Sequence, residues 1–509
     1  MAGRERVRTG IKGLDAILGP GIPRGNVILL EGAIGAGKTT FGVEFVYRGA
    51  SEFNEPGLIV LFEVSPDRLI SDAAELGWDL PALERAGTLK LIFTTRQVFI
   101  EEVVLTDSLL LEQASQMGAR RMFIDGVPSL PAAIGDTGVH ARDAFHLLAE
   151  GLQRDGRTAV LAVEATSFSD KRTVALPEEA IADTVIRLRL EDVTRATVRS
   201  IEIVKSRGHE FQMGRHSFRI VDGAGIVVHR RVQAPRPPPR DDAAAVDLTT
   251  RVTTGVPGLD PLVNGGYLLG STTVIAGISG VGKSVMGLQY LAEGARLDER
   301  SLMLSLDEQV PQILRNAATI GIDLQKSIAS GLVKVRYDRP QEIEIDRHFD
   351  DIEQLIETFK PTRVVFDSLS TYGSNLGTKG RVFRDFFHAL VALMKEHQTA
   401  TVYNHENPQM LGMGSMMGEF HMSSLVDNIV LMNWIELGRA FRLGLTIAKM
   451  RANPNTRETY ECEILNGQGM RVLPSRLPSD AARPSSGYLN LISRSPARLW
   501  ADVDPGEKD

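Results

Sequence analysis

Short apolar runs alternate with helical patterns along the first half of the chain. The runs NVILLEG, GLIVLFE, RRMFIDG and TAVLAVE have the length of strands that are buried on both faces of a sheet. Between them lie segments with helical spacing of apolar residues, such as ARDAFHLLAEGLQRDG. This alternation predicts an α/β fold with a mainly parallel sheet flanked by helices. The later runs VIRLRL, SIEIVKSR, FRIV and IVVHR have short connections, which predicts an antiparallel extension of that sheet.

The same pattern occurs twice. RVRTGIKGLDAILGPG begins at Arg6 and RVTTGVPGLDPLVNGG begins at Arg251, and 251 − 6 = 245. The segments RMFIDGVPS, IADTVIRL and IVKSRG return later as VVFDSLSTY, LVDNIVLM and IAKMRA. A period of this length indicates a duplicated domain and not a solenoid repeat. The proline-rich stretch QAPRPPPR predicts an extended linker. We therefore expect a first lobe at 1–234, a linker at 235–246, a second lobe at 247–475 and a tail at 476–509.

Each lobe contains a phosphate-binding loop of the pattern G-x-x-x-x-G-K-[ST], at Gly32–Thr39 and at Gly277–Ser284. Each loop follows an apolar strand and opens an amphipathic helix, which is the context that supports the motif. The backbone N–H groups of such a loop and the helix N-terminus bind phosphates. The lysine contacts the β and γ phosphates. The predicted ATP-binding residues of the two loops are Gly35, Ala36, Gly37, Lys38, Thr39, Thr40, Ser279, Gly280, Val281, Gly282, Lys283, Ser284 and Val285.

Acidic residues follow the next strands. Asp125 ends RRMFID and Asp367 ends RVVFD. In phosphate-loop proteins such an acid holds Mg²⁺ together with the loop hydroxyl, so we expect one magnesium site at Thr39 and Asp125 and another at Ser284 and Asp367. A turn or helix-cap aspartate is the structural alternative.

A further carboxylate is needed to activate the group that attacks the γ-phosphate. LIVLFEVS offers Glu63, and LMLSLDEQ offers Asp307 and Glu308. A gap-free repeat pairs Glu63 with Glu308, whereas a shift of one position pairs it with Asp307. The structural alternative is a solvated strand end. In either register, the second lobe has one carboxylate more than the first.

Basic pairs recur on a late strand of each lobe, as Lys205 and Arg207 and as Lys449 and Arg451. Alternation along a strand places each pair on one face. We predict that these four side chains bind ATP, as cations presented to the nucleotide of a neighbouring subunit. Ordinary solvated strand charges are the alternative.

With both phosphate loops, both magnesium acids and both K-x-R strands in order, residues 6 to 475 resemble the KaiC family, the double-domain ATPases and autokinases of the RecA-like superfamily. This resemblance implies tandem RecA-like domains in a hexameric ring with ATP between subunits. It also implies ATP hydrolysis in the first lobe, and KaiB-like or response-regulator proteins as partners. The segment EFHMSSLVDNIVLMNWIE is similar to the part of that family that carries two phosphorylated hydroxyl residues, which makes Ser423 and Ser424 the expected phosphoacceptors.

The sequence also departs from the family pattern. The family has a glutamate pair after the second strand of each domain; here the pairs read Glu63–Val64 and Asp307–Glu308. The usual Ser-Thr acceptor pair is Ser-Ser. With Asp183 aligned to Asp427, the positions of Ser423 and Ser424 are occupied in the first lobe by Glu179 and Ala180. A hydroxyl can attack phosphorus once a base accepts its proton, so we expect hydrolysis in the first lobe and phosphorylation and dephosphorylation of serine in the second. A helix cap or loop is the structural alternative for these serines.

Composition limits the other possibilities. The 509 residues include 43% hydrophobic and 24% charged residues and carry a formal charge of −7, which argues against a dedicated nucleic-acid binder. Cys462 is the only cysteine, and no apolar run approaches the roughly 20 residues of a membrane span, so we expect a cytoplasmic protein without membrane contact. Two other functions share the same core: an ATP-driven nucleic-acid motor, and a signalling scaffold assembled by ATP.

Overall fold

In the computed structural model the chain divides into two compact units, Met1–Arg231 and Val232–Asp509. The structure describes residues 5–19, 21–104, 109–126, 141–164, 177–193, 196–234, 249–375, 381–406, 424–437, 440–451 and 457–476. The predicted linker at 235–246 and the tail beyond 476 therefore lie outside the described residues, as does Ser423.

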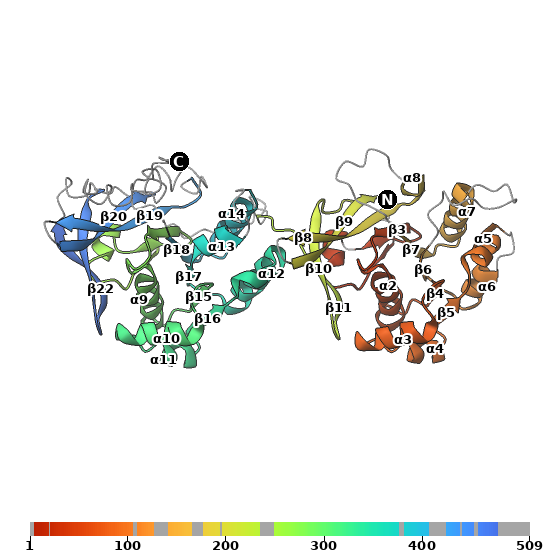
Figure 1. The fold of residues 1–509 in the computed structure, drawn as a ribbon, viewed down its shortest axis with the longest axis horizontal. Coiled ribbons are helices and arrows are strands. Elements are labelled where there is room, and N and C mark those ends of the chain that lie inside the picture. The colour runs from red at the N-terminus through yellow and green to blue at the C-terminus, as the bar shows by residue number, and fades with distance from the viewer. Residues whose placement is uncertain are drawn as a thin grey trace, which may run out of the picture. The chain divides into compact units, whose positions relative to one another are not determined.

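The first unit is built on a nine-stranded sheet of order β11-β10-β9-β8-β3-β7-β6-β4-β5 (Figure 1). Strands β8, β3, β7, β6, β4 and β5 are parallel to their neighbours in that order, while β9, β10 and β11 extend the sheet antiparallel. The strands are β3 (Val27–Gly32), β4 (Gly57–Leu61), β5 (Leu89–Phe93), β6 (Arg121–Ile124), β7 (Thr158–Glu164), β8 (Thr184–Val193), β9 (Ala196–Ser206), β10 (Arg215–Val221) and β11 (Gly225–His229).

The second unit repeats this topology in a nine-stranded sheet of order β16-β15-β17-β18-β14-β19-β20-β21-β22. Its last three strands are again the antiparallel ones. Both sheets confirm the predicted α/β fold and its antiparallel extension. The strands are β14 (Thr272–Gly277), β15 (Ser301–Ser305), β16 (Val333–Tyr337), β17 (Arg363–Asp367), β18 (Ala400–Glu406), β19 (Asn428–Leu437), β20 (Ala440–Met450), β21 (Thr459–Leu465) and β22 (Gly469–Arg476).

Helices cover both sheets, and the helix after each phosphate loop packs on the central strands: α2 on β4 and β6, and α9 on β15 and β17 (Figure 1). The first unit contains α1 (Leu14–Ile17), α2 (Lys38–Glu52), α3 (Pro66–Glu75), α4 (Leu80–Arg85), α5 (Arg96–Val104), α6 (Leu109–Gln116), α7 (Ala141–Arg154) and α8 (Pro177–Ile181). The second contains α9 (Lys283–Arg296), α10 (Val310–Thr319), α11 (Leu324–Ala329), α12 (Ile345–Phe359), α13 (Leu369–Asn375) and α14 (Arg381–Glu396).

Four short strands and two 3₁₀ helices complete the elements of the described residues. They are β1 (Arg6–Val7), β2 (Ile22–Pro23), β12 (Arg251–Val252), β13 (Tyr267–Leu268), η2 (Asp260–Val263) and η3 (Pro340–Glu342). Among the residues that the structure describes, no helix has both the length and the apolar character needed to cross a bilayer.

Strand pairing fixes the register that the repeat left open. In the first lobe Gly57 of β4 pairs with Arg121, and in the second lobe Ser301 of β15 pairs with Arg363. Since 301 − 57 = 244, the residue that corresponds to Glu63 is Asp307, and Glu308 corresponds to Val64. The extra carboxylate of the second lobe is therefore Glu308.

The lobes differ inside their cores. Glu31 of β3 is fully buried and pairs across the sheet with Arg187 of β8, whose Nε lies 2.7 Å from the Glu31 Oε2. The corresponding pair in the second lobe is Ala276 and Leu431, on β14 and β19. The first lobe thus holds a buried ion pair where the second lobe holds two apolar side chains.

Candidate nucleotide sites

Both phosphate loops have the backbone that the motif predicts. Gly37 and Gly282 precede the helices α2 and α9 with φ of 102° and 91°, a conformation that residues with a Cβ adopt rarely. A Cβ added to Gly282 would lie 2.6 Å from the side chains of Ile464 and Met470. Glycine is therefore required where the chain turns from the loop into the helix, whose free N–H groups then face the loop.

The two loop lysines fold back over their own loops in the same way. The Nζ of Lys38 donates to the carbonyls of Gly32 at 2.8 Å and Ala33 at 3.0 Å. Lys283 makes the same two contacts, to Gly277 at 2.9 Å and to Ile278 at 2.8 Å. Burial lowers the pKa of both lysines. A bound phosphate group would add negative charge beside these partly desolvated ammonium groups.

Each loop hydroxyl lies beside the acid that the sequence assigned to magnesium. The Oγ1 of Thr39 donates to the Oδ2 of Asp125 at 2.7 Å. Burial raises the pKa of Asp125 and of Asp367, and hydrogen bonds from Thr39 and Ser284 oppose this rise. A hydroxyl and a carboxylate are hard oxygen ligands of the kind that Mg²⁺ prefers, so both donor sets fit this ion. Among the described residues no cluster of three or more His, Cys, Asp or Glu side chains forms another metal site.

The candidate catalytic carboxylates are held differently in the two lobes. Glu63 forms an ion pair with Arg96, the first residue of α5. Asp307 accepts a hydrogen bond of 2.5 Å from the Oγ1 of Thr371 on α13. Glu308 is turned toward α10, where its Oε2 accepts from the Nδ2 of Asn316 at 2.8 Å. Asp307, the counterpart of Glu63, is thus bound toward α13, and Glu308 is bound toward α10.

The sequence analysis missed one carboxylate in each site. Glu164 ends β7 and pairs with Gly32, while Glu406 ends β18 and pairs with Gly277. Each carboxylate opposes the lowering of the pKa of its loop lysine. The signal was available, because the runs TAVLAVE and ATVYNHE both end in glutamate at corresponding strand ends.

The basic pair of the first lobe contacts the segment just before β8, the strand with which the antiparallel extension pairs. Lys205 donates to the carbonyls of Glu179 at 2.8 Å and Ala182 at 2.7 Å, and Arg207 donates to Ala180 at 3.0 Å. Both side chains of the pair therefore lie on one face, as the alternating pattern predicts.

In the second lobe the same pair contacts the segment that carries the expected phosphoacceptors. Lys449 donates to the carbonyl of Val426 at 2.7 Å, and Arg451 donates to the carbonyl of Ser424 at 2.6 Å. Arg451 also bonds the carboxylate of Asp427 at 3.2 Å. Ser424 is exposed at the end of this segment. Ser423 lies outside the described residues.

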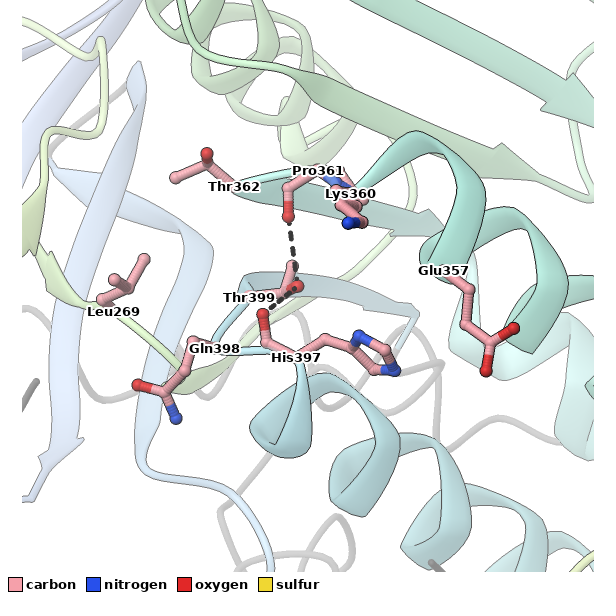
Figure 2. A pocket seen from close by; sticks show the side chains of 8 residues that line it. All are labelled: Leu269, Glu357, Lys360, Pro361, Thr362, His397, Gln398 and Thr399. Atoms are coloured by element: carbon pink, nitrogen blue, oxygen red, sulfur yellow. Dashed lines mark hydrogen bonds between the residues drawn. The ribbon is translucent and has the colours of Figure 1, made fainter. Parts of the chain in front are cut away.

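In the second unit, a cavity of about 460 Å³ lies at the amino ends of the sheet strands, the ends away from the phosphate loop (Figure 2). Its lining includes the residues that precede β17 and β18, whose far ends carry Asp367 and Glu406. Figure 2 shows the Thr399 hydroxyl bonded to the carbonyls of Pro361 and His397. The remaining lining residues are Leu269, Glu357, Lys360, Thr362 and Gln398. The cavity is therefore separate from the phosphate loop.

Comparison with known proteins identifies the family. A family model described as "ATPase: KaiC" matches residues 7–233 and again residues 252–476. The chain belongs to the KaiC family. It is 30% identical over 509 residues to the circadian clock oscillator protein KaiC of Picosynechococcus sp., covering 98% of this chain and 94% of that protein. It is 28% identical over 477 residues to the circadian clock protein KaiC3 of Synechocystis sp., covering 92% of each.

The two matches of the KaiC model coincide with the two lobes, so both copies of the repeat are KaiC ATPase domains. Membership of this ATPase family agrees with the two phosphate loops and implies that the protein binds ATP. The tandem arrangement of RecA-like domains, which the sequence analysis expected, is therefore confirmed.

Proposed function

We propose that this KaiC-family protein hydrolyses ATP in its first lobe and uses ATP in its second lobe to phosphorylate Ser423 and Ser424, with removal of the phosphate by the same lobe. The observation that carries the proposal is the difference between two otherwise matching sites. The second lobe has the serine pair where the first has Glu179 and Ala180. It also has the additional carboxylate Glu308.

The phosphoryl transfer would proceed by attack of a serine Oγ on the γ-phosphorus. The new Oγ–P bond forms as the bond from the γ-phosphorus to the ADP oxygen breaks, and the serine proton moves to a carboxylate, for which Asp307 is the candidate. Mg²⁺ held by Ser284 and Asp367 would neutralise charge on the phosphate oxygens. Lys283 would hold the β and γ phosphates. In the first lobe Glu63 would orient water in place of serine.

We propose further that the acceptor serines receive phosphate from ATP bound to an adjacent subunit of a ring, most simply a homo-hexamer. The basic pairs support this arrangement, because Lys449 and Arg451, at the end of β20, hydrogen-bond to the segment that carries Ser424 and would move with it to a neighbour's nucleotide. A ring whose phosphorylation state changes could be recognised by KaiB-like or response-regulator proteins.

Matched variants of the two loop lysines test the division of labour. The full-length chain is incubated with Mg²⁺ and ATP labelled at the γ-phosphate, and both serine-bound label and released phosphate are measured. Lys283→Ala should abolish the serine label and leave most phosphate release. Lys38→Ala should do the reverse, since the lysine of each loop contacts the phosphates of its own site.

The same assay separates the competing functions. Serine label that persists in Lys283→Ala would contradict the assignment of the kinase to the second lobe. Turnover that rises when single-stranded DNA is added would instead indicate a nucleic-acid motor. Binding of ATP without label or turnover would indicate a scaffold.

A further inference from the structure

A network of hydroxyl groups leads to the candidate base of the second lobe, Asp307. It consists of Ser368, Ser370 and Thr371, in the turn that joins β17 to α13 and in the first turn of α13. The Ser368 Oγ lies 2.8 Å from the Ser370 Oγ and 3.1 Å from the Thr371 Oγ1. The Thr371 Oγ1 donates to the Oδ1 of Asp307 at 2.5 Å. The hydroxyl network therefore ends on the carboxylate.

The network is anchored to the walls of the nucleotide site. Ser370 accepts a hydrogen bond of 3.1 Å from the backbone N–H of Glu406, at the end of β18. Ser368 follows Asp367 directly and is only 4% exposed. The carboxyl ends of β15, β17 and β18 are thus joined by hydrogen bonds, and these three ends carry Asp307, Asp367 and Glu406.

The first lobe holds its candidate catalytic carboxylate in a different way. Asp125 corresponds to Asp367, and 367 − 125 = 242. At this offset Gly126, Pro128 and Ser129 stand at the positions of Ser368, Ser370 and Thr371, so the first lobe lacks two of the three hydroxyls and keeps the third. Glu63 is held by the guanidinium of Arg96 instead. The two hydroxyls of Ser368 and Ser370, which fix Thr371, are therefore found only in the sequence of the lobe with the proposed acceptor serines.

We propose that Thr371 is a positioning residue that orients the Asp307 carboxylate toward the attacking hydroxyl, with Ser368 and Ser370 fixing Thr371 in turn. A carboxylate has two oxygens, and the hydroxyl of Thr371 occupies Oδ1, which leaves Oδ2 to accept the serine proton. The network donates only neutral hydrogen bonds, so it fixes the orientation of the carboxylate without adding a cation. This inference rests on the proposed autokinase function.

The test measures the rate of serine labelling by full-length protein as a function of ATP concentration. Thr371→Val keeps the shape of the side chain and removes the donor. It should lower kcat for labelling by about tenfold or more, because an unfixed base spends little time in reacting geometry. The KM for ATP should stay within about twofold, because Thr371 acts on the base and not on the nucleotide.

Two further variants separate positioning from structure. Thr371→Ser retains the hydroxyl and should restore labelling to within about threefold of the wild-type rate. Ser374→Ala is the matched control, since Ser374 lies on the same helix and, among the described residues, its hydroxyl bonds within that helix, to the carbonyl of Ser370 at 3.1 Å. It should leave labelling unchanged.

Several results would overturn the inference while leaving the autokinase proposal intact. These are wild-type labelling kinetics in Thr371→Val, a raised KM with unchanged kcat, or label on Thr371 itself. If the wild-type chain carries no serine label, the autokinase proposal fails. The role of Thr371 is then decided by phosphate release in a Lys38→Ala background, where only the second lobe has its loop lysine. If Thr371→Val leaves this release unchanged, or if there is no release, the proposed role of Thr371 is overturned.

Discussion

Glu44 allows a direct test of what a buried ionisable group costs in the core, because the second lobe has a different residue at the same position. Glu44 lies on α2 with a fully buried side chain, and its Oε2 accepts from the backbone N–H of Ile226 at 2.7 Å. The second lobe has Gln289 at this position, and its Oε1 accepts from the N–H of Met470 at 2.8 Å. The contact is the same, but only the first lobe uses an ionisable group.

Burial raises the pKa of Glu44 from 4.5 to about 7, against the opposing hydrogen bond from Ile226 and the charge of Arg48. The folded state therefore binds the proton more tightly than the unfolded state does. The stability of the first lobe should be unaffected by this group below pH 4.5 and should fall as the pH rises toward 7. The difference of 7 − 4.5 = 2.5 pKa units corresponds to about 3 kcal/mol once the pH exceeds 7.

Glu44→Gln should remove this cost. The Nε2 of Gln289 donates to the carbonyls of Gly255 and Met470 at 3.3 and 3.0 Å, and the corresponding carbonyls of the first lobe belong to Gly10 and Ile226. The attraction of Arg48 is already included in the pKa of about 7, so its loss is not subtracted again. We expect a net gain of about 3 kcal/mol at pH 8 and less than about 1 kcal/mol at pH 5.

Hydrogen exchange of the α2 amides at increasing urea concentration would measure this change in the free energy of unfolding in the full chain, because these amides report on the first lobe alone. Gln289→Glu is the reverse control and should destabilise α9 at pH 8 more than at pH 5. A Glu44→Gln effect of the same size at both pH values would refute the reasoning, since only ionisation of Glu44 makes the effect depend on pH.

Three further predictions concern buried charge and magnesium. Arg187→Leu should destabilise the first lobe by about 3 kcal/mol because it leaves Glu31 buried without its cation. Adding Glu31→Ala to this variant should recover most of the loss. Urea unfolding of the two single variants and of the double variant would measure this double-mutant cycle. Arg121→Met should cost about 3 kcal/mol in the same assay, since the guanidinium is fully buried and its Nε donates to Glu55 at 2.6 Å; an unchanged midpoint would contradict this. Chelation of Mg²⁺ by excess EDTA should abolish both serine label and phosphate release, and added Mg²⁺ should restore them; activity that survives chelation would contradict the magnesium sites.

Several site residues could be predicted because their signals are local. The phosphate loops combine glycines, a lysine and a hydroxyl within eight positions, and the backbone of Gly37 and Gly282 follows from the absence of a Cβ. The acids Asp125 and Asp367 were predicted because each ends a recognisable buried strand. Glu164 and Glu406 were missed although the runs TAVLAVE and ATVYNHE also end in a carboxylate, because the sequence alone does not show that these strand ends lie beside the loop lysines.

By itself the sequence determined the duplication, the strand and helix order, the two phosphate loops and the contrast between the Ser423–Ser424 pair and its first-lobe counterparts. These features follow from local residue spacing and from the repeat of 245 residues, neither of which requires knowing which strands are neighbours. Only the tertiary structure decided that Asp307 and not Glu308 matches Glu63, and that Asp307 is bound by Thr371, 64 residues away in the chain. The physical reason is the parallel sheet: it brings the carboxyl ends of strands that are distant in sequence to one edge, and strand pairing alone sets which side chains meet there.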